Sequence, residues 1–136
     1  MTLDLDAWSA RAVTDTIFGW HCRGLSLALC LRTPDRFIGL LMCEKPRLLA
    51  AENCTRPDIL IEGPQKAFDQ IGRTDPPPGS HSFGALLRHT TGIKVSAEPV
   101  IQAQALAALE RLIEVSRHGR AYFDGHGFAH DEAAVT

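Results

Sequence analysis

The chain has 136 residues, of which 45% are hydrophobic, and a formal net charge of −2 at pH 7. A chain of this length buries roughly two-thirds of its unfolded surface in one core, so it needs neither a metal nor a disulfide to fold. The near-neutral charge predicts no nucleic-acid partner, because phosphate binding requires clustered Lys and Arg. No run approaches the ~18 apolar residues that indicate a membrane span.

The N-terminus and the cysteines indicate the cellular compartment of the protein. The first residues, Met1 to Asp6, are acidic and lack the basic and apolar regions of an export signal, so we expect a cytoplasmic protein. The four cysteines are far apart, form no Cys-x-x-Cys pair, and mostly fall in or beside apolar strand patterns: Cys22, Cys30, Cys43 and Cys54. We predict four reduced thiols that pack as small hydrophobic side chains.

Apolar spacing predicts a first helix from about Asp6 to Gly19, with Asp4 or Asp6 as its cap. Its stripe recurs every three, four or five residues: Leu5, Trp8, Ala12, Val13, Ile17 and Trp20. Strict alternation over 24–32 then predicts a strand, and a Thr-Pro-Asp turn predicts its pairing as a hairpin with a second strand over 36–43. Both faces of this second strand are apolar, which is typical of a strand covered on both sides.

Two further strands are expected over 47–53 and 58–62. The second of these stops at Gly63, which permits a sharp turn. A helix follows from Pro64 to about Ile71, because proline suits a first helical position where its missing N–H would have no partner.

A loop with three consecutive prolines comes next, over 75–80. Ser82 is placed to cap a short helix after this loop. A last strand is expected over 93–96, and it runs into the longest apolar stripe of the chain. That stripe predicts a helix from Pro99 that ends at Gly119, and its apolar members are Ile101, Ala105, Leu106, Leu109, Leu112 and Ile113.

We divide the chain into one domain, residues 1–117, and a flexible C-terminal tail, residues 118–136, which contains Gly, His and Ala. The order of the elements predicts an α+β fold. A single, mostly antiparallel sheet should form one layer, with helices packed on one face.

Two strand-to-helix stretches carry a family resemblance. Pro57–Phe68 reads Pro-Asp-Ile-Leu-Ile-Glu-Gly-Pro-Gln-Lys-Ala-Phe, and 92–99 reads Gly-Ile-Lys-Val-Ser-Ala-Glu-Pro. Joined by a helix, they resemble the C-terminal half of the sterol carrier protein two family of lipid-binding domains, although the second stretch lacks the family's Gly-Asp pair. The resemblance implies a sterol-carrier-like fold with an apolar cavity between the sheet and the C-terminal helices. Such a cavity takes a sterol, a fatty acyl chain or an isoprenoid lipid.

By the matching positions, nine residues are candidate lipid-binding walls of that cavity. They come from one strand, two short helices and the last helix: Ile59, Ile61, Phe68, Phe83, Leu86, Leu87, Leu106, Leu109 and Ile113. Periodicity alone does not distinguish a lined cavity from a filled core. Two hypotheses therefore stay open: a lipid carrier, and a non-enzymatic protein-interaction module or accessory subunit with a filled core.

The sequence contains no established catalytic motif, so we expect no enzyme, no cofactor and no metal site. A nucleophilic pair could be built only from Cys22 with a histidine such as His21. The tail histidines are of a type that binds metals, but their glycine-rich spacing favours a solvated segment: His118, His126 and His130.

The partners expected for a lipid carrier are a hydrophobic small molecule or lipid and, for exchange, a transient membrane contact. Basic residues near the strand ends are candidates for that contact: Arg36, Lys45, Arg47 and Arg56. A homodimer and a partner enzyme are further options that the sequence leaves open.

Overall fold

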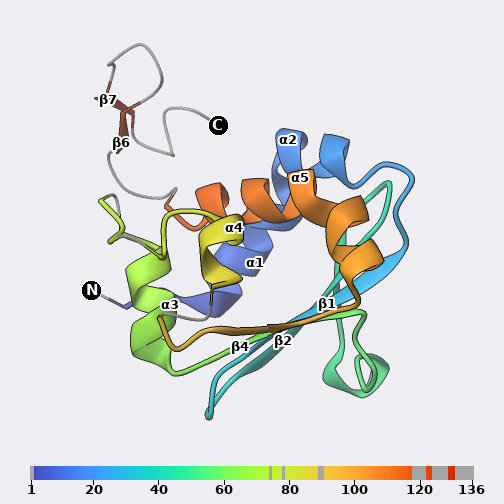
Figure 1. Cartoon of the computed structure of the whole chain (residues 1–136). Helices are drawn as coiled ribbons and strands as arrows, with labels where there is room; N and C mark the ends of the chain where they lie inside the picture. Colours follow the sequence, from blue (N-terminus) through green and yellow to red (C-terminus); the bar gives the residue numbers. More distant parts are fainter. Residues whose placement is uncertain are drawn as a thin grey trace.

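The computed structural model of the chain describes residues 2–73, 75–77, 79–88 and 91–117, together with the backbone of 122–123 and 129–130. A five-stranded sheet forms one layer, and the helices α1 to α5 lie on one of its faces (Figure 1). The predicted α+β fold is therefore confirmed. The expectation of a flexible tail over 118–136 falls largely outside the described residues. The described part of this segment consists of two short strands, β6 (Tyr122–Phe123) and β7 (Ala129–His130), which pair with each other.

Two helices replace the single helix that was predicted at the N-terminus. They are α1 (Leu5–Thr14) and α2 (Thr16–His21). Asp4 caps the first helix, since its carboxylate accepts two backbone N–H groups of the first turn. Asp15 separates the helices in an extended conformation and caps the second, because its carboxylate accepts the Phe18 N–H at 2.8 Å. The apolar stripe continues across this break, so periodicity did not reveal it.

The sheet has the order β3-β2-β1-β4-β5. Its strands are β1 (Leu27–Arg32), β2 (Phe37–Met42), β3 (Arg47–Leu49), β4 (Ile59–Glu62) and β5 (Lys94–Ser96). Neighbouring strands are antiparallel except for β1 and β4, which run parallel. The mostly antiparallel sheet and the hairpin of β1 with β2 are therefore confirmed.

The segment after β3 turns onto the face of the sheet that bears no helix. It contains one turn of 3₁₀ helix, η1 (Ala51–Asn53), where the sequence predicted strand as far as residue 53. Cys54 follows this turn and forms a disulfide with Cys30 of β1. The prediction of four reduced thiols is wrong for these two cysteines, because the bend after β3 brings a residue that is distant in sequence against the middle of the sheet. Cys22 and Cys43 are free.

The prediction that both faces of β2 are covered holds only in part. Leu40 and Met42 face the helices and are fully buried. On the other face, η1 and Cys54 cover the centre of the strand so closely that a Cβ added at Gly39 would lie 3.2 Å from the Cys54 side chain. Phe37 and Leu41 flank this point and stay half-buried.

The remaining helices agree with the sequence to within a few residues. They are α3 (Gln65–Ile71), α4 (Phe83–Leu86) and α5 (Pro99–Val115). Ser82 caps α4 as predicted, with its hydroxyl accepting the Ala85 N–H at 3.1 Å. None of the helices in the described part of the chain has the length and hydropathy of a membrane span.

The turn between β4 and α3 depends on its glycine. A Cβ added at Gly63 would lie 2.8 Å from the Gly92 carbonyl oxygen, closer than non-bonded atoms allow. The absence of a side chain therefore lets the start of α3 approach the segment that leads into β5. The two strand-to-helix stretches lie side by side as a result.

Candidate functional site

Seven of the nine candidate wall residues lie in the core with none of their surface exposed to solvent. They are Ile59, Ile61, Phe68, Phe83, Leu86, Leu109 and Ile113. β4 supplies the first two from its helix-facing side, and α3, α4 and α5 close over them. In this conformation these side chains pack against one another and their neighbours in a single hydrophobic cluster.

The other two candidates lie at the margin of this cluster. Leu87 follows α4 and is partly buried against the core. Leu106 is 45% exposed on the outer side of α5, whereas the adjacent Ala105 is 1% exposed and faces inward. Leu106 and Ala105 both belong to the apolar stripe of this helix in the sequence. Which of the two is buried depends on how α5 is oriented on the sheet.

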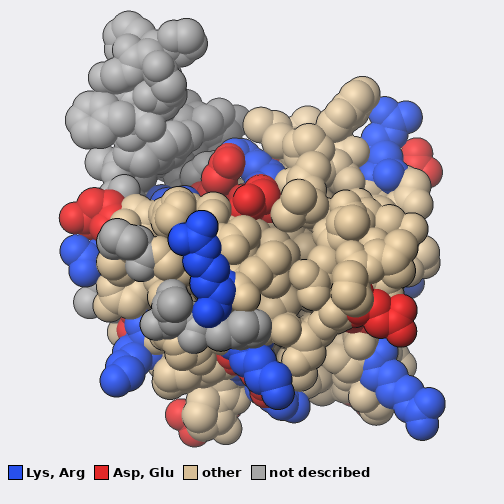
Figure 2. Space-filling model, in the orientation of Figure 1, with Lys and Arg blue, Asp and Glu red and all other residues tan. Residues whose placement is uncertain are grey.

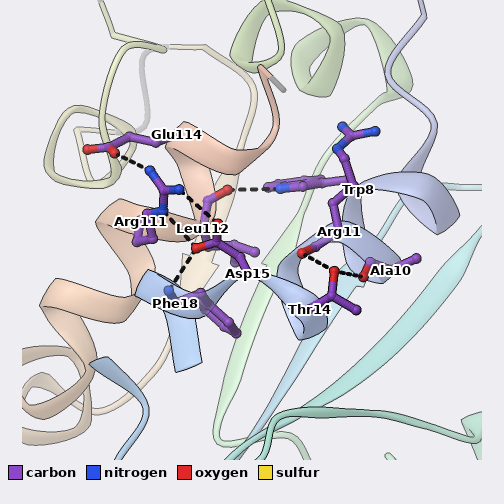
Figure 3. Close-up of polar contacts among 9 residues, drawn as sticks. All are labelled: Trp8, Ala10, Arg11, Thr14, Asp15, Phe18, Arg111, Leu112 and Glu114. Carbon is purple, nitrogen blue, oxygen red and sulfur yellow. Dashed lines mark hydrogen bonds and ion pairs between the residues drawn. The ribbon is translucent and has the colours of Figure 1, made fainter. Parts of the chain in front are cut away.

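The N-terminal helices supply part of the core that the candidate set missed. Trp8 is fully buried on α1, and its ring meets that of Phe68 edge to face at a centroid distance of 6.2 Å. Its indole Nε1–H donates to the Leu112 carbonyl oxygen of α5 at 2.8 Å, as Figure 3 shows. Phe18 of α2 is also fully buried. The stripe through Leu5 and Trp8 was the available signal, but it gave no indication of which elements this helix would contact.

A partly buried ion pair fastens α5 to the junction of α1 and α2. The Arg111 guanidinium donates two hydrogen bonds of 2.8 Å to the Asp15 carboxylate, and the two side chains are only 15% and 14% exposed (Figure 3). The hydrogen bonds that Arg111 donates to Asp15 raise the pKa of Arg111, although burial acts in the opposite direction. Arg111 also pairs with Glu114 one turn further along α5 at 3.1 Å.

Further contacts tie the C-terminal end of α5 to α3 and to the loop before α4. Arg117 donates to the carbonyl oxygens of Ile71 at 3.2 Å, Ser80 at 3.3 Å and His81 at 3.1 Å. Its partial burial lowers its pKa. Glu110 accepts the backbone N–H of Phe83 at the start of α4. Residues 110–117 are therefore joined by polar contacts to each neighbouring helix.

The N-terminal half of α5 is attached differently. From Pro99 to Leu109 the sequence contains no charged residue. Within the described residues, the side-chain hydrogen bonding of this half is local, from Gln102 Nε2 to the Ala97 carbonyl oxygen at 2.9 Å. Its inner side is buried in the core through Ala105, Ala108 and Leu109. Apolar packing therefore holds this half of the helix in place.

A surface pocket of about 420 Å³ lies elsewhere, at the end of β1 and β4. Its walls are Arg32, Thr33, Pro34, Glu62, Gly63, Gly92 and Lys94, and none of these is a candidate wall residue. Arg32 and Glu62 form an ion pair within it. These charged walls do not suit the apolar part of a lipid.

Comparison with known proteins identifies the fold. A solution structure from Thermus thermophilus, described as possibly a sterol carrier protein, aligns with 85% of this chain and 89% of its own, at 13% identity and a TM-score of 0.55. A crystal structure of sterol carrier protein 2 aligns with 82% of this chain and 94% of its own, at 12% identity and a TM-score of 0.55. The chain has the sterol carrier protein fold. No family model and no curated protein matches the sequence.

Within this sterol carrier fold, Cys22 is not an activated nucleophile. It is fully buried at the end of α2, and burial raises the pKa of its thiol to about 12, with Cys43 as a smaller cause. His21 beside it in sequence is exposed. The described residues also contain no group of three or more His, Cys, Asp and Glu side chains that could hold a metal ion. The tail histidines His118 and His126 lie outside the described residues.

The predicted basic cluster does not form as one group. Arg36 precedes β2 and pairs with Asp6 of α1. Lys45 follows the opposite end of the same strand. The hairpin therefore separates two residues that the sequence analysis had assigned to one membrane-facing edge.

Proposed function

We propose that the protein binds a hydrophobic ligand, namely a sterol, a fatty acyl chain or an isoprenoid lipid, between its sheet and its C-terminal helices. It carries or presents this ligand without catalysing a reaction. The observation that carries the proposal is the fold match with a protein described as sterol carrier protein 2 over 82% of the chain. The apolar lining available from β4, α3, α4 and α5 supports it.

Burial of an acyl chain in such a site provides enough free energy for binding. Each methylene group transferred from water to an apolar site contributes ~0.8 kcal/mol, so roughly ten of them contribute about 8 kcal/mol. This corresponds to micromolar affinity before the costs of binding are subtracted. No catalytic group and no cofactor is required.

Because the seven buried wall residues expose no surface, a ligand reaches them only if part of the helical layer moves. The N-terminal half of α5 is the element that we expect to move, since its attachment among the described residues is apolar packing with one local side-chain hydrogen bond. A guest that replaces the lost apolar contacts would restore their free energy. Residues 110–117 would stay in place because their ion pair and carbonyl contacts are polar and directional.

The second candidate function is a non-enzymatic interaction module or accessory subunit whose core is filled by its own side chains. The complete burial of Ile59, Phe68 and Leu109 favours this alternative. Under it, the half-buried face of the sheet around Phe37 and Leu41 would meet a second copy or a partner enzyme. The cytoplasmic location stays a prediction, and the Cys30–Cys54 disulfide removes one of its grounds.

Two experiments separate these functions. Purified protein, extracted and analysed by mass spectrometry, should yield a stoichiometric lipid if it is a carrier. Leu109→Trp, which adds volume inside the core, should then abolish loading of a fluorescent fatty acyl probe while the far-UV circular dichroism spectrum is kept. Leu106→Trp is the matched control on the outer side of the same helix and should load normally. Clean protein that takes up no probe at micromolar concentration would support the interaction module.

A further inference from the structure

Two neighbouring helices present an exposed surface without charged side chains. α5 has no Asp, Glu, Lys or Arg from Pro99 to Leu109, and α2 has none along its length. Four large apolar side chains of these helices are roughly half exposed or more: Ile17 at 50%, Trp20 at 65%, Val100 at 59% and Leu106 at 45%. These four residues are called the uncharged helical face below.

The two helices pack against each other, so their outer sides form neighbouring parts of one surface. Figure 2 shows a broad area over α2 and the first half of α5 that is free of charged atoms. The outer side of a helix that faces water normally carries charged or polar residues. Single exposed apolar residues are common, but a group of them on adjacent helices marks an interaction surface.

The margin of this face favours a lipid bilayer as its partner. The Arg23 guanidinium stacks over the Trp20 ring at 4.7 Å. Tryptophan and arginine both combine a long apolar body with a polar end, which suits the boundary between acyl chains and head groups. An uncharged face also suits a protein partner, because interface cores are depleted of charged residues, so the choice of a bilayer rests on the Trp20–Arg23 pair and on the basic residues beside α2.

Basic residues also lie next to α2. Pro46 Cδ would be 3.9 Å from a Cβ added at Gly19, so the turn between β2 and β3 adjoins this helix. Lys45 and Arg47 stand on either side of Pro46 and are both exposed, while Glu44 is the acidic residue of the turn. With Arg23, the margin beside α2 carries three positive charges against one negative charge, which complements anionic head groups, and the acidic Glu98 lies at the other end of the face, before α5.

We propose that the uncharged helical face docks the protein on a lipid bilayer, with Arg23, Lys45 and Arg47 beside the head groups. This proposal rests on the proposed function, because a lipid carrier exchanges its ligand at a membrane. The docked face includes the outer side of the half of α5 that covers the core. Insertion of Val100 and Leu106 among acyl chains would thereby weaken the hold of this half on the sheet where the ligand is exchanged.

Flotation of the full chain with vesicles tests the docking. Vesicles of phosphatidylcholine, alone and mixed with phosphatidylglycerol, should both retain the protein, and the anionic mixture should retain more of it at low salt. The double variant Ile17→Ser with Val100→Ser should lower the partition coefficient roughly tenfold or more, because two apolar side chains leave the bilayer. Leu48→Ser is the matched control: Leu48 is also 50% exposed, but it lies on the edge strand β3.

The two tryptophans give a second readout within the same protein. Lipids brominated on their acyl chains should quench Trp20, which is exposed, and leave Trp8, which is fully buried, unchanged. Trp20→Phe should abolish this quenching while the emission of Trp8 persists.

Three results would overturn the proposal. The first is a wild-type protein that floats with neither type of vesicle. The second is an equal loss of binding in the double variant and in Leu48→Ser. The third is a wild-type dimer in solution that the double variant converts to a monomer, which would assign the face to a second copy of the chain.

Probe binding without vesicles separates this proposal from the proposed function. If docking is correct, the double variant binds a fluorescent fatty acyl probe in solution as the wild type does. A wild type that docks but never binds a probe would end the proposed function and leave the docking inference standing.

Discussion

The two halves of α5 belong to one helix but are attached in different ways. Residues 110–117 contact the neighbouring helices through a bidentate ion pair, an indole-to-carbonyl bond and three arginine-to-carbonyl bonds. Residues 99–109 are uncharged and rest on apolar packing, with one local side-chain hydrogen bond among the described contacts. Directional contacts resist displacement, whereas apolar contacts can be exchanged for those of a guest molecule. This difference is the basis for proposing that the N-terminal half of α5 moves when a ligand enters the core.

Breaking the ion pair should have the largest effect on stability. Arg111→Met removes two hydrogen bonds of 2.8 Å from the Asp15 carboxylate, which is only 14% exposed. We expect the free energy of unfolding to fall by about 2–4 kcal/mol, measured by urea denaturation. Arg73→Met is the matched control, since Arg73 and Asp75 form a pair that is 46% and 80% exposed, and its loss should cost under about 1 kcal/mol. Equal losses in the two variants would show that Arg111 does not fasten the helix.

Removing the indole donor tests the same half of α5 at a second point. Trp8→Phe leaves the buried Leu112 carbonyl oxygen without its partner at 2.8 Å. The expected loss is about 1–3 kcal/mol by the same urea measurement. Trp20→Phe, at an exposed position, should stay within about 0.5 kcal/mol of the wild type. A Trp8→Phe variant as stable as the wild type would show that this bond does not hold α5.

The titration of Cys22 tests whether the core beneath the helices is dry. Burial in the folded protein raises the pKa of this thiol from 9.0 to about 12. The unfolded state therefore loses a proton that the folded state keeps, and the free energy of unfolding falls as pH rises from 9 towards 12. The slope from this group is at most about 1.4 kcal/mol per pH unit. The free energy of unfolding of Cys22→Ala should fall less steeply between pH 9 and 12, by that amount. Identical slopes for the two proteins would mean that water reaches the thiol.

Loosening the N-terminal half should change the rate of ligand uptake with a small effect on stability. Ala107→Gly, at an exposed position of α5, costs about 1 kcal/mol of helix stability. If this half opens for uptake, stopped-flow loading of a fluorescent acyl probe should be ~5-fold faster. Ala10→Gly carries the same cost on the exposed side of α1 and should leave the rate unchanged. Equal rates in all three proteins would place the opening elsewhere.

Local patterns predicted most of the fold. Alternation gave β1 and β2, and Ser82 and Gly63 marked a helix cap and a turn that the structure contains. Contacts between distant segments were not predictable in this way. The break at Asp15 follows from its bond to Phe18 and its pair with Arg111, 96 residues away, and neither disturbs the apolar stripe.

The candidate site shows the same limit: local patterns identified some of its residues, and contacts between distant segments decided the others. Period and resemblance selected Ile59 and Leu109, which the structure places together in the core. They did not select Trp8, because a stripe shows that a helix has a buried side and does not show which elements cover it. They also included Leu106, since a shift of one residue around the helix axis separates it from the buried Ala105.

Amide hydrogen exchange, followed by mass spectrometry with and without ligand, tests whether the N-terminal half of α5 opens for a lipid. Cholesterol, oleate and a polyprenol would each be added to the free protein. We expect residues 99–109 to exchange faster than 110–115 in the free protein, and a bound lipid to slow exchange in 99–109 at least about tenfold while it leaves 110–115 nearly unchanged. Equal exchange in the two halves, unaffected by every lipid, would contradict this expectation.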